Sequence, residues 1–297
     1  MFNRLPFQNV LNRKNMLSAL MGMLCWGSVS APAQAWWETG HMTVAQLAYD
    51  ELTPAARAEA ERLIAVLDPM QPDVNRRHFV PASIWMDEIK GRGLRTFDEW
   101  HYINIPYNPE GLGVVEDAKE VNVVSMIEKL TKTLHSDKAG DFEKAFALRM
   151  LIHMVGDVHQ PFHAVGKVSH AYPHGDWGGN RTLVKSPGVK NIHALWDSTA
   201  GLFENNIAMN EWQVRIPPYV QTLKTTYPKA QFQHVLSDTP QQWAEESFKL
   251  AVKYGYSTLP EDGQVTELYR QGVQRVVGER LALGGYRLGA LLNAALQ

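Results

Sequence analysis

Two His-x3-Asp pairs in apolar stretches constrain the fold of this chain more than any other feature of its sequence. His153 and Asp157 form the first pair, and His193 and Asp197 repeat it forty residues later. Residues four apart lie on the same face of a helix, and imidazoles and carboxylates are ligands that zinc accepts. A single histidine is more simply a core or surface residue with a local partner. Two matching pairs, with His163 beside the first, instead predict a buried metal site.

The first 35 residues have the composition of a segment that directs export. Three basic and no acidic residues precede an apolar stretch at 16–29, and the small-x-small sequence Ala33-Gln34-Ala35 follows it. This pattern predicts a cleaved signal peptide at 1–35 and a mature chain of 36–297 in the periplasm or outside the cell. An uncleaved N-terminal anchor is the alternative. No later stretch is apolar over 18 residues, so we expect no membrane span.

Charge and cysteine content limit how the mature chain can bind and fold. The formal net charge is -2, and loss of three basic residues with the signal leaves 26 basic and 31 acidic residues, or -5. No basic field is available to hold a nucleic-acid duplex, so we expect no stable duplex binding. A polyanionic substrate would need a local cation such as a metal ion. Because the one cysteine, Cys25, lies in the signal, bound metal is a candidate stabiliser in place of disulfides.

The spacing of apolar residues predicts an all-α fold, a single mainly helical domain. The stretches 67–82, 101–116 and 165–191 carry proline, glycine and polar residues without helical periodicity. We expect them to be irregular loops, with at most a short hairpin in the last. Helices are expected at 42–66 with a break at Pro54, and at 84–90, 118–135, 141–159, 191–203, 240–254 and 264–295.

Four further residues have the character of metal ligands. Asp87 lies among apolar residues in I-W-M-D-E-I, and His101 lies in W-H-Y-I-N. Cleavage after residue 35 would make Trp36 the new N-terminus, five residues before His41. A free α-amino group and the carbonyl of the same residue can chelate a metal, which lowers the pKa of the amine. Removal of the signal would then complete the site.

Taken in order from Trp36 to Asp197, these residues strongly resemble the zinc-dependent single-strand nuclease and 3′-nucleotidase family. That family includes the secreted fungal S1/P1-type nucleases, plant bifunctional nucleases and bacterial relatives. Its fold is shared with bacterial zinc-dependent phospholipase C. The mature chain contains no cysteine and so lacks the disulfides of the fungal and plant members; in this it resembles the bacterial branch.

The resemblance implies a trinuclear zinc site at 36–297, in which Asp157 bridges the first and third ions. It assigns the first ion to Asp87, His101, His153 and Asp157. It assigns the second ion to His163, His193 and Asp197. It assigns the third ion to the amine and carbonyl of Trp36, and to His41 and Asp157.

The same resemblance implies the reaction. Family members cleave single-stranded RNA and DNA to 5′-phosphate products and also act on 3′-nucleotides, so these are the expected substrates. A hydroxide bridging two zinc ions would attack phosphorus, with Asp87 and Asp157 as catalytic ligands. Lys90, three residues after Asp87, matches a cationic residue that stabilises the transition state. A solvated lysine on a helix face is the alternative for Lys90.

Four residues match substrate-binding positions of the family. Tyr102 stands where an aromatic ring stacks a nucleobase, an interaction that needs unpaired bases, although a core tyrosine is the alternative. Asn104 stands where some fungal members have an acidic residue, so base preference does not transfer. Asp176 and Asn180, in D-W-G-G-N, match the loop beside the zinc cluster, where Asn180 would donate to phosphate or to a ligand.

Two other functions stay open from the sequence. A phospholipase C of the same fold would also use three zinc ions on a phosphodiester. Tyr102 favours a base-stacking site over a choline pocket, and Asp197 stands where the lipases typically have glutamate. A non-catalytic periplasmic zinc-binding protein is the third possible function, but a cationic residue at Lys90 favours an enzyme. No obligate protein partner is expected.

Overall fold

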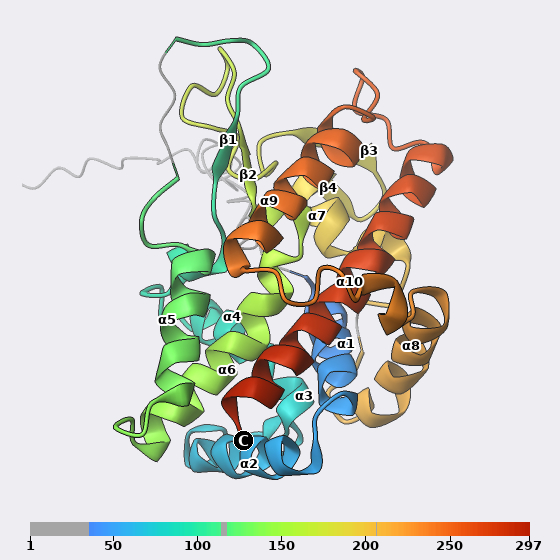
Figure 1. Ribbon diagram of the computed structural model, residues 1–297. Helices are drawn as coiled ribbons and strands as arrows, with labels where there is room; N and C mark the ends of the chain where they lie inside the picture. Colours follow the sequence, from blue (N-terminus) through green and yellow to red (C-terminus); the bar gives the residue numbers. More distant parts are fainter. Residues whose placement is uncertain (1–35, 114–117, 206) are drawn as a thin grey trace, which may run out of the picture. The chain divides into compact units, whose positions relative to one another are not determined.

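The computed structural model describes residues 36–113, 118–205 and 207–297, which form a single, mainly helical domain (Figure 1). The expected signal segment 1–35 lies outside these residues. Within them, no helix is long and apolar enough to cross a membrane. The all-α prediction is confirmed. The helices are α1 (Glu38–Asp50), α2 (Pro54–Val66), α3 (Phe79–Ala82), α4 (Trp85–Gly91), α5 (Val123–His135), α6 (Asp141–Val158), α7 (Ile192–Asp197), α8 (Trp212–Thr226), α9 (Pro240–Leu250) and α10 (Glu267–Ala295).

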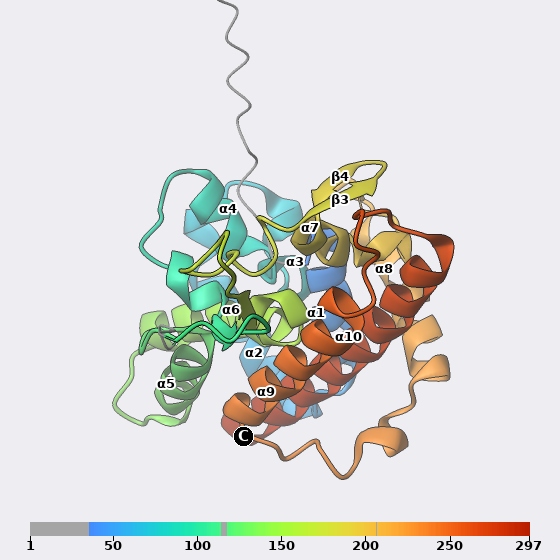
Figure 2. The ribbon, with the colours of Figure 1, turned by 90° about the horizontal axis from the view of Figure 1, so that it is seen from above.

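Two small sheets join parts of the loops. β3 (Leu183–Ser186) and β4 (Val189–Asn191) form an antiparallel hairpin beside α7 (Figure 2), which is the short hairpin expected in 165–191. β1 (Ile105–Tyr107) pairs in parallel with β2 (Val165–Lys167), which the sequence did not predict. Because these strands are sixty residues apart, their pairing places the segment after His101 beside the segment after His163.

α6 runs through the interior of the domain. Every residue from 147 to 158 is buried, and the helix packs against α1, α2, α4, α5 and α10. A helix that is covered on all sides is apolar almost throughout, and the polar residues of this stretch are Arg149, His153 and Asp157. Buried polar groups need partners. The first His-x3-Asp pair therefore lies at the centre of the fold.

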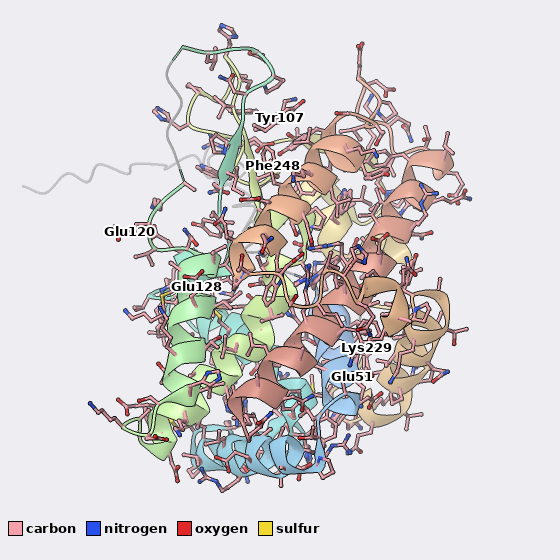
Figure 3. The ribbon with its side chains drawn as sticks, viewed as in Figure 1. Glu51, Tyr107, Glu120, Glu128, Lys229 and Phe248 are labelled. Atoms are coloured by element: carbon pink, nitrogen blue, oxygen red, sulfur yellow. The ribbon has the colours of Figure 1, made fainter. Side chains whose placement is uncertain are left out.

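α10 approaches α1 closely because glycines face the contact. An added Cβ at Gly285 would lie 2.8 Å from Leu47 Cβ, and one at Gly289 would lie 2.9 Å from Glu51 Cβ. Lys229 Nζ also binds Glu51 Oε2 at 2.8 Å (Figure 3). These contacts fix the position of α1, which carries His41, relative to the rest of the domain.

The bounds of several helices differ from the sequence prediction, and α7 ends at Asp197 instead of 203. α5 begins at Val123 instead of 118, because the Asn122 side chain accepts hydrogen bonds from the N–H groups of Val124 and Ser125 and caps the helix there. The stretch 67–82, expected to be a loop, contains α3 and two 3₁₀ turns.

Like α3, the helix α8 was not predicted from the sequence. α8 contains Pro217 and Pro218, which break the helical pattern of the sequence. Both prolines lie in the second turn, beyond the four N-terminal residues whose N–H groups have no helical partner, so each removes a backbone hydrogen bond from the helix.

A charged cluster joins α9 to α10 beneath the end of α6. The guanidinium groups of Arg280 and Arg287 are almost fully buried and bind Glu246 at 2.8 and 2.7 Å. Arg287 Nη1 also lies 3.1 Å from His159 Nε2, while His159 Nδ1 donates to Val155 O at 2.7 Å. Burial and the two arginines lower the pKa of His159, so it stays neutral and structural.

Removal of the charge of Glu246 should destabilise the domain. Glu246→Gln leaves the buried Arg280 guanidinium without a carboxylate and leaves Arg287 with Asp238 alone, at 3.3 Å, so we expect a loss of about 3 kcal/mol at pH 7. Burial raises the pKa of Glu246, but Arg287 and Arg280 outweigh that effect and the net pKa is lowered. The wild-type advantage is therefore present above the ordinary glutamate pKa and is lost as pH falls through the lowered value.

Urea unfolding at several pH values measures this difference. Glu245→Gln, which alters the exposed neighbouring carboxylate on α9, serves as the control and should leave the free energy of unfolding nearly unchanged. A pH-independent difference between Glu246→Gln and wild type would contradict the assignment.

Candidate metal centre

The C-terminal end of α6 brings together the residues predicted to bind metal. His153 and Asp157 lie on the same face of α6, with Nε2 and Oδ2 3.1 Å apart. His101 Nδ1, from the turn before β1, lies 3.1 Å from the same Asp157 oxygen and 3.0 Å from His153 Nε2. Asp87 on α4 completes this group, with Oδ1 3.7 Å from His101 Nδ1.

A second group lies at α7 and the turn that follows α6. His193 Nε2 is 3.2 Å from Asp197 Oδ2, and His163 Nε2 is 3.9 Å from Asp197 Oδ1. Gln160 Nε2 donates to that Oδ1 atom at 2.5 Å. His163, His193 and Asp197 are all buried, and their ligand atoms lie close enough to hold one metal ion.

A third group forms around His41 on α1. His41 Nε2 is 3.3 Å from Asp157 Oδ1, and its ring stacks on that of His153 at 3.9 Å. The structure groups His41 with His153 and Asp157, whereas the resemblance adds Trp36 in place of His153. Trp36 lies next to this group, because its buried indole N–H donates to Gly156 O at 2.9 Å.

Asp157 is shared between the groups. Oδ2 faces His101 and His153, while Oδ1 faces His41. His163 Nδ1 lies 3.8 Å from Oδ1. One fully buried carboxylate therefore has an oxygen directed at each of two candidate metal positions.

Backbone carbonyls orient three of the imidazoles. Nδ1 of His153, His163 and His193 lies 2.6–2.7 Å from the carbonyl oxygens of Ser83, His101 and Gly178, respectively. A carbonyl only accepts, so each Nδ1 carries the proton in the neutral ring and Nε2 offers a lone pair. This pattern is typical of metal-binding histidines.

The cluster contains buried polar atoms without hydrogen-bond partners, which is the test of whether a metal fits. Such atoms each cost about 1–3 kcal/mol when left unpaired, and a cation among them would use their lone pairs. They are His41 Nδ1 and Nε2, Asp87 Oδ1, His101 Nε2, Asp157 Oδ1, His163 Nε2 and His193 Nε2. The donor set of imidazoles and carboxylates suits zinc.

Burial shifts the two kinds of ligand in opposite directions. It lowers the pKa of His41 and His101 and raises the pKa of Asp87 and Asp157. The charge of Lys90, one turn after Asp87 on α4, opposes the rise for both carboxylates. Lys90 therefore lies within electrostatic reach of Asp87 and Asp157, and its role toward a phosphate stays a prediction.

A cavity of about 240 Å³ contains the residues predicted to contact a base, one of which directly follows His101 in the chain. Tyr102 and Asn104 line it from the segment around β1. Trp177 lines it from the D-W-G-G-N loop, together with His174. The β1–β2 pairing closes one side of the cavity through Gly166.

Trp177 is a site residue that sequence reasoning missed. Its side chain is 59% exposed, its φ is 57°, and the Arg181 guanidinium covers its ring at 3.5 Å. Bulky residues rarely adopt positive φ, and such strain clusters at functional sites. A tryptophan between Asp176 and two glycines was the available signal.

Asp176 occupies a different place from the expected one. Its carboxylate is fully buried and accepts hydrogen bonds from the backbone of Lys167 and Gly179 and from the hydroxyls of Thr182 and Tyr256. We therefore assign it to support of the loop, in place of the substrate contact that the resemblance implies. Asn180 is half-buried, and its Nδ2 donates to Trp177 O at 2.8 Å.

The comparisons with known proteins agree with this geometry. The family model described as S1/P1 Nuclease matches residues 36–297. The chain belongs to the S1/P1 nuclease family. Membership of this family implies a hydrolase of nucleic-acid phosphodiester bonds.

Plant and fungal relatives span most of this S1/P1 nuclease. Endonuclease 1 from Arabidopsis thaliana is 26% identical over 306 residues, covering 93% of this chain and 92% of its own. Nuclease P1 from Penicillium citrinum is 24% identical, covering 87% and 97%. Nuclease S1 from Aspergillus oryzae is 25% identical, covering 87% and 91%. Placement in the bacterial branch stays a prediction.

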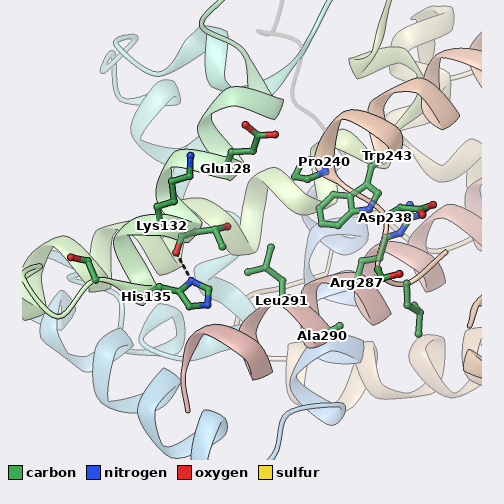
Figure 4. Close-up of a pocket in the computed structure, with 13 residues that line it drawn as sticks. Glu128, Lys132, His135, Asp238, Pro240, Trp243, Arg287, Ala290 and Leu291 are labelled. Atoms are coloured by element: carbon green, nitrogen blue, oxygen red, sulfur yellow. Dashed lines mark hydrogen bonds and ion pairs between the residues drawn. The ribbon is translucent and has the colours of Figure 1, made fainter. Parts of the chain in front are cut away.

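A groove of about 690 Å³ lies apart from this centre, between α5 and the C-terminal part of α10 (Figure 4). Leu236, Trp243 and Leu291 supply its apolar surface, and Glu128 and Lys132 lie at its α5 side. None of the predicted site residues lines it. The smaller cavity, in contrast, is lined by the predicted site residues Tyr102 and Asn104.

Substitution of Asp157 should have the largest effect on metal binding. Asp157→Asn removes the charge shared by two groups, so we expect two metal positions to be lost and the His163 group to be retained. Zinc per chain after dialysis measures the result. Asp141→Asn, at the exposed N-terminus of the same helix, is the control. Unchanged zinc content in Asp157→Asn would contradict the shared-ligand arrangement.

Proposed function

We propose that this S1/P1 nuclease is an exported zinc-dependent phosphodiesterase that cleaves single-stranded RNA and DNA to 5′-phosphate products and removes phosphate from 3′-nucleotides. The observation that carries the proposal is the position of Asp157. Its two oxygens point to two of the three ligand groups, and Tyr102, which follows His101 in the chain, lines a cavity together with Trp177.

Three zinc ions are proposed, with the nine ligands that the resemblance assigns. Bound zinc supplies a water of lowered pKa and positive charge for the phosphate. The chain's residues hold the ligands in place through the carbonyls of Ser83, His101 and Gly178. The exclusively nitrogen and oxygen donor set supports zinc over metals that favour thiolates.

Lys90 is proposed to stabilise charge on the phosphate. It lies on α4 one turn from Asp87, and its charge opposes the burial that raises the pKa of Asp87, Asp157 and Asp197. An ammonium in this position acts as a point charge toward a phosphate oxygen. Asn180, in the adjacent loop, is proposed as a second donor to the phosphate.

The substrate is proposed to be single-stranded because the cavity is lined by aromatic rings. Tyr102 and Trp177 line the same 240 Å³ space, and ring stacking requires a base that is not paired in a duplex. Asn104, in the same space, offers both a donor and an acceptor to a base edge. Stacking tolerates every base, so RNA and DNA are both expected substrates.

Export is proposed from the sequence of 1–35. The family match begins at residue 36, which supports cleavage directly before Trp36. Trp36 is fully buried beside Gly156 and Asp157. A new α-amino group at this residue would therefore lie close to the His41 group. The mature chain is proposed to be in the periplasm or outside the cell.

A substrate panel tests the proposed function. Zinc-loaded mature chain 36–297 is incubated with a single-stranded oligonucleotide, a 3′-nucleotide and a choline phospholipid. We expect cleavage of the first two, with 5′-phosphate products from the oligonucleotide. Cleavage of the lipid alone would move the chain to phospholipase C chemistry, and zinc-loaded protein inactive on all three would contradict an enzymatic role.

Loss of the Trp177 ring should weaken binding of single strands. Stacking contributes about 1–3 kcal/mol per base, so Trp177→Ala should raise KM for a single-stranded oligonucleotide about tenfold and leave kcat nearly unchanged. Trp177→Phe, which keeps a ring, should retain most of the affinity. Leu183→Ala, at another exposed apolar residue, is the control. Equal KM values for all four proteins would remove Trp177 from the substrate site.

A further inference from the structure

The loop at 176–180 has a backbone that needs support from outside itself. Trp177, Gly178 and Gly179 have φ values of 57°, 60° and 81°, three successive residues in the left-handed region. An added Cβ at Gly178 would lie 2.5 Å from Phe162 O, so the loop is pressed against the turn that carries His163. A tryptophan in this conformation is strained. Such strain persists only when surrounding contacts fix it.

The carboxylate of Asp176 supplies many of these contacts. Oδ1 accepts hydrogen bonds from the N–H groups of Lys167 and Gly179 at 3.0 Å, and Oδ2 accepts from the Thr182 hydroxyl at 2.7 Å. Tyr256 Oη lies 2.8 Å from Oδ2 and 3.0 Å from Oδ1. One buried carboxylate therefore accepts hydrogen bonds from β2, from the loop, from Thr182 just beyond it and from a tyrosine distant in the sequence.

Tyr256 reaches Asp176 because the chain after α9 forms a single turn of π-helix at Ala251–Tyr256. Gly255 in this turn packs on Phe162, where an added Cβ would lie 2.5 Å from Cζ. Turns of this kind occur often at functional sites. Burial and the Asp176 carboxylate raise the pKa of Tyr256 well above its ordinary value, so its hydroxyl keeps the proton that it donates.

The backbone of the loop is hydrogen-bonded to a predicted metal ligand, His193. Gly178 O accepts the Nδ1 proton of His193 at 2.6 Å, which leaves the Nε2 lone pair beside Asp197 Oδ2 at 3.2 Å. His193 Nε2 is buried without a hydrogen-bond partner of its own. A shift of the Gly178 carbonyl would therefore release the orientation of His193.

We propose that Asp176 and Tyr256 are positioning residues that fix His193 for the metal bound by His163, His193 and Asp197. They act through the Gly178 carbonyl and contact neither metal nor substrate. This inference rests on the proposed zinc site. It predicts an effect on one of the three ions, because the other two groups take their support from Ser83, α1 and α4.

Tyr256→Phe is the test variant, because it removes one hydroxyl and keeps the ring. Tyr269→Phe is the matched control: the Tyr269 hydroxyl donates to Gly255 O at 3.0 Å, in the same π turn, but it does not contact Asp176. Zinc affinities of the mature chain are measured by competition with a chelating dye. A loss of support for a ligand lowers metal affinity about 10–100-fold, so we expect one of three zinc ions to weaken at least tenfold in Tyr256→Phe and none in Tyr269→Phe.

A second measurement, on the metal-free protein, monitors the orientation of His193 directly. The Nδ1 proton of His193 should give a slowly exchanging imidazole resonance in metal-free wild type and Tyr269→Phe, and it should exchange faster in Tyr256→Phe. Asp176→Asn should produce both effects more strongly, because the amide cannot accept from every donor that the carboxylate serves.

The outcomes separate this inference from the proposed function. Three zinc ions in wild type, with equal affinities and equal His193 exchange in both tyrosine variants, would overturn the positioning role alone. Equal weakening of all three ions in Tyr256→Phe would make Tyr256 a general structural residue, which also overturns it. Wild-type protein that binds no zinc would overturn the proposed function, and the inference with it.

Discussion

The shared carboxylate of Asp157 is the constraint on which the rest of the site depends. It lies at the end of a helix that is buried on all sides, and its two oxygens are directed at different histidines. A buried, unpaired carboxylate is costly, so it must share charge with protons or cations. Asp157 Oδ1 and the Nε2 atoms of His41 and His163 have no hydrogen-bond partner, and a cation among them would use these lone pairs.

The fold supplies rigid elements to each side of that carboxylate. Gly156 of α6, where an added Cβ would lie 3.0 Å from His41 Nδ1, lets α1 bring His41 to Asp157, and α4 brings Asp87 and Lys90. The short β1–β2 pair then places Tyr102 within one cavity with Trp177. Metal ligands therefore come mainly from helices, and the residues facing the substrate come from loops that small sheets and Asp176 hold in place.

The two His-x3-Asp pairs could be predicted from the sequence because helical spacing fixes their i, i+4 geometry, whereas Asp87, His101 and His41 were assigned to the groups from the family resemblance. The all-α class followed from the same periodicity. Long-range contacts could not be predicted in this way: the pairing of β1 with β2 rests on three residues a strand, and Trp177 carries no periodic signal. Asp176 was misplaced because a carboxylate beside two glycines gives no indication of whether it faces solvent or its own loop.

The most direct test of the account is the location of zinc by anomalous scattering from crystals of the zinc-soaked mature chain. We predict three peaks, two of them on either side of the Asp157 carboxylate and the third between His163, His193 and Asp197. A single peak at Asp157, or zinc bound away from these residues, would contradict a shared carboxylate as the basis of the site.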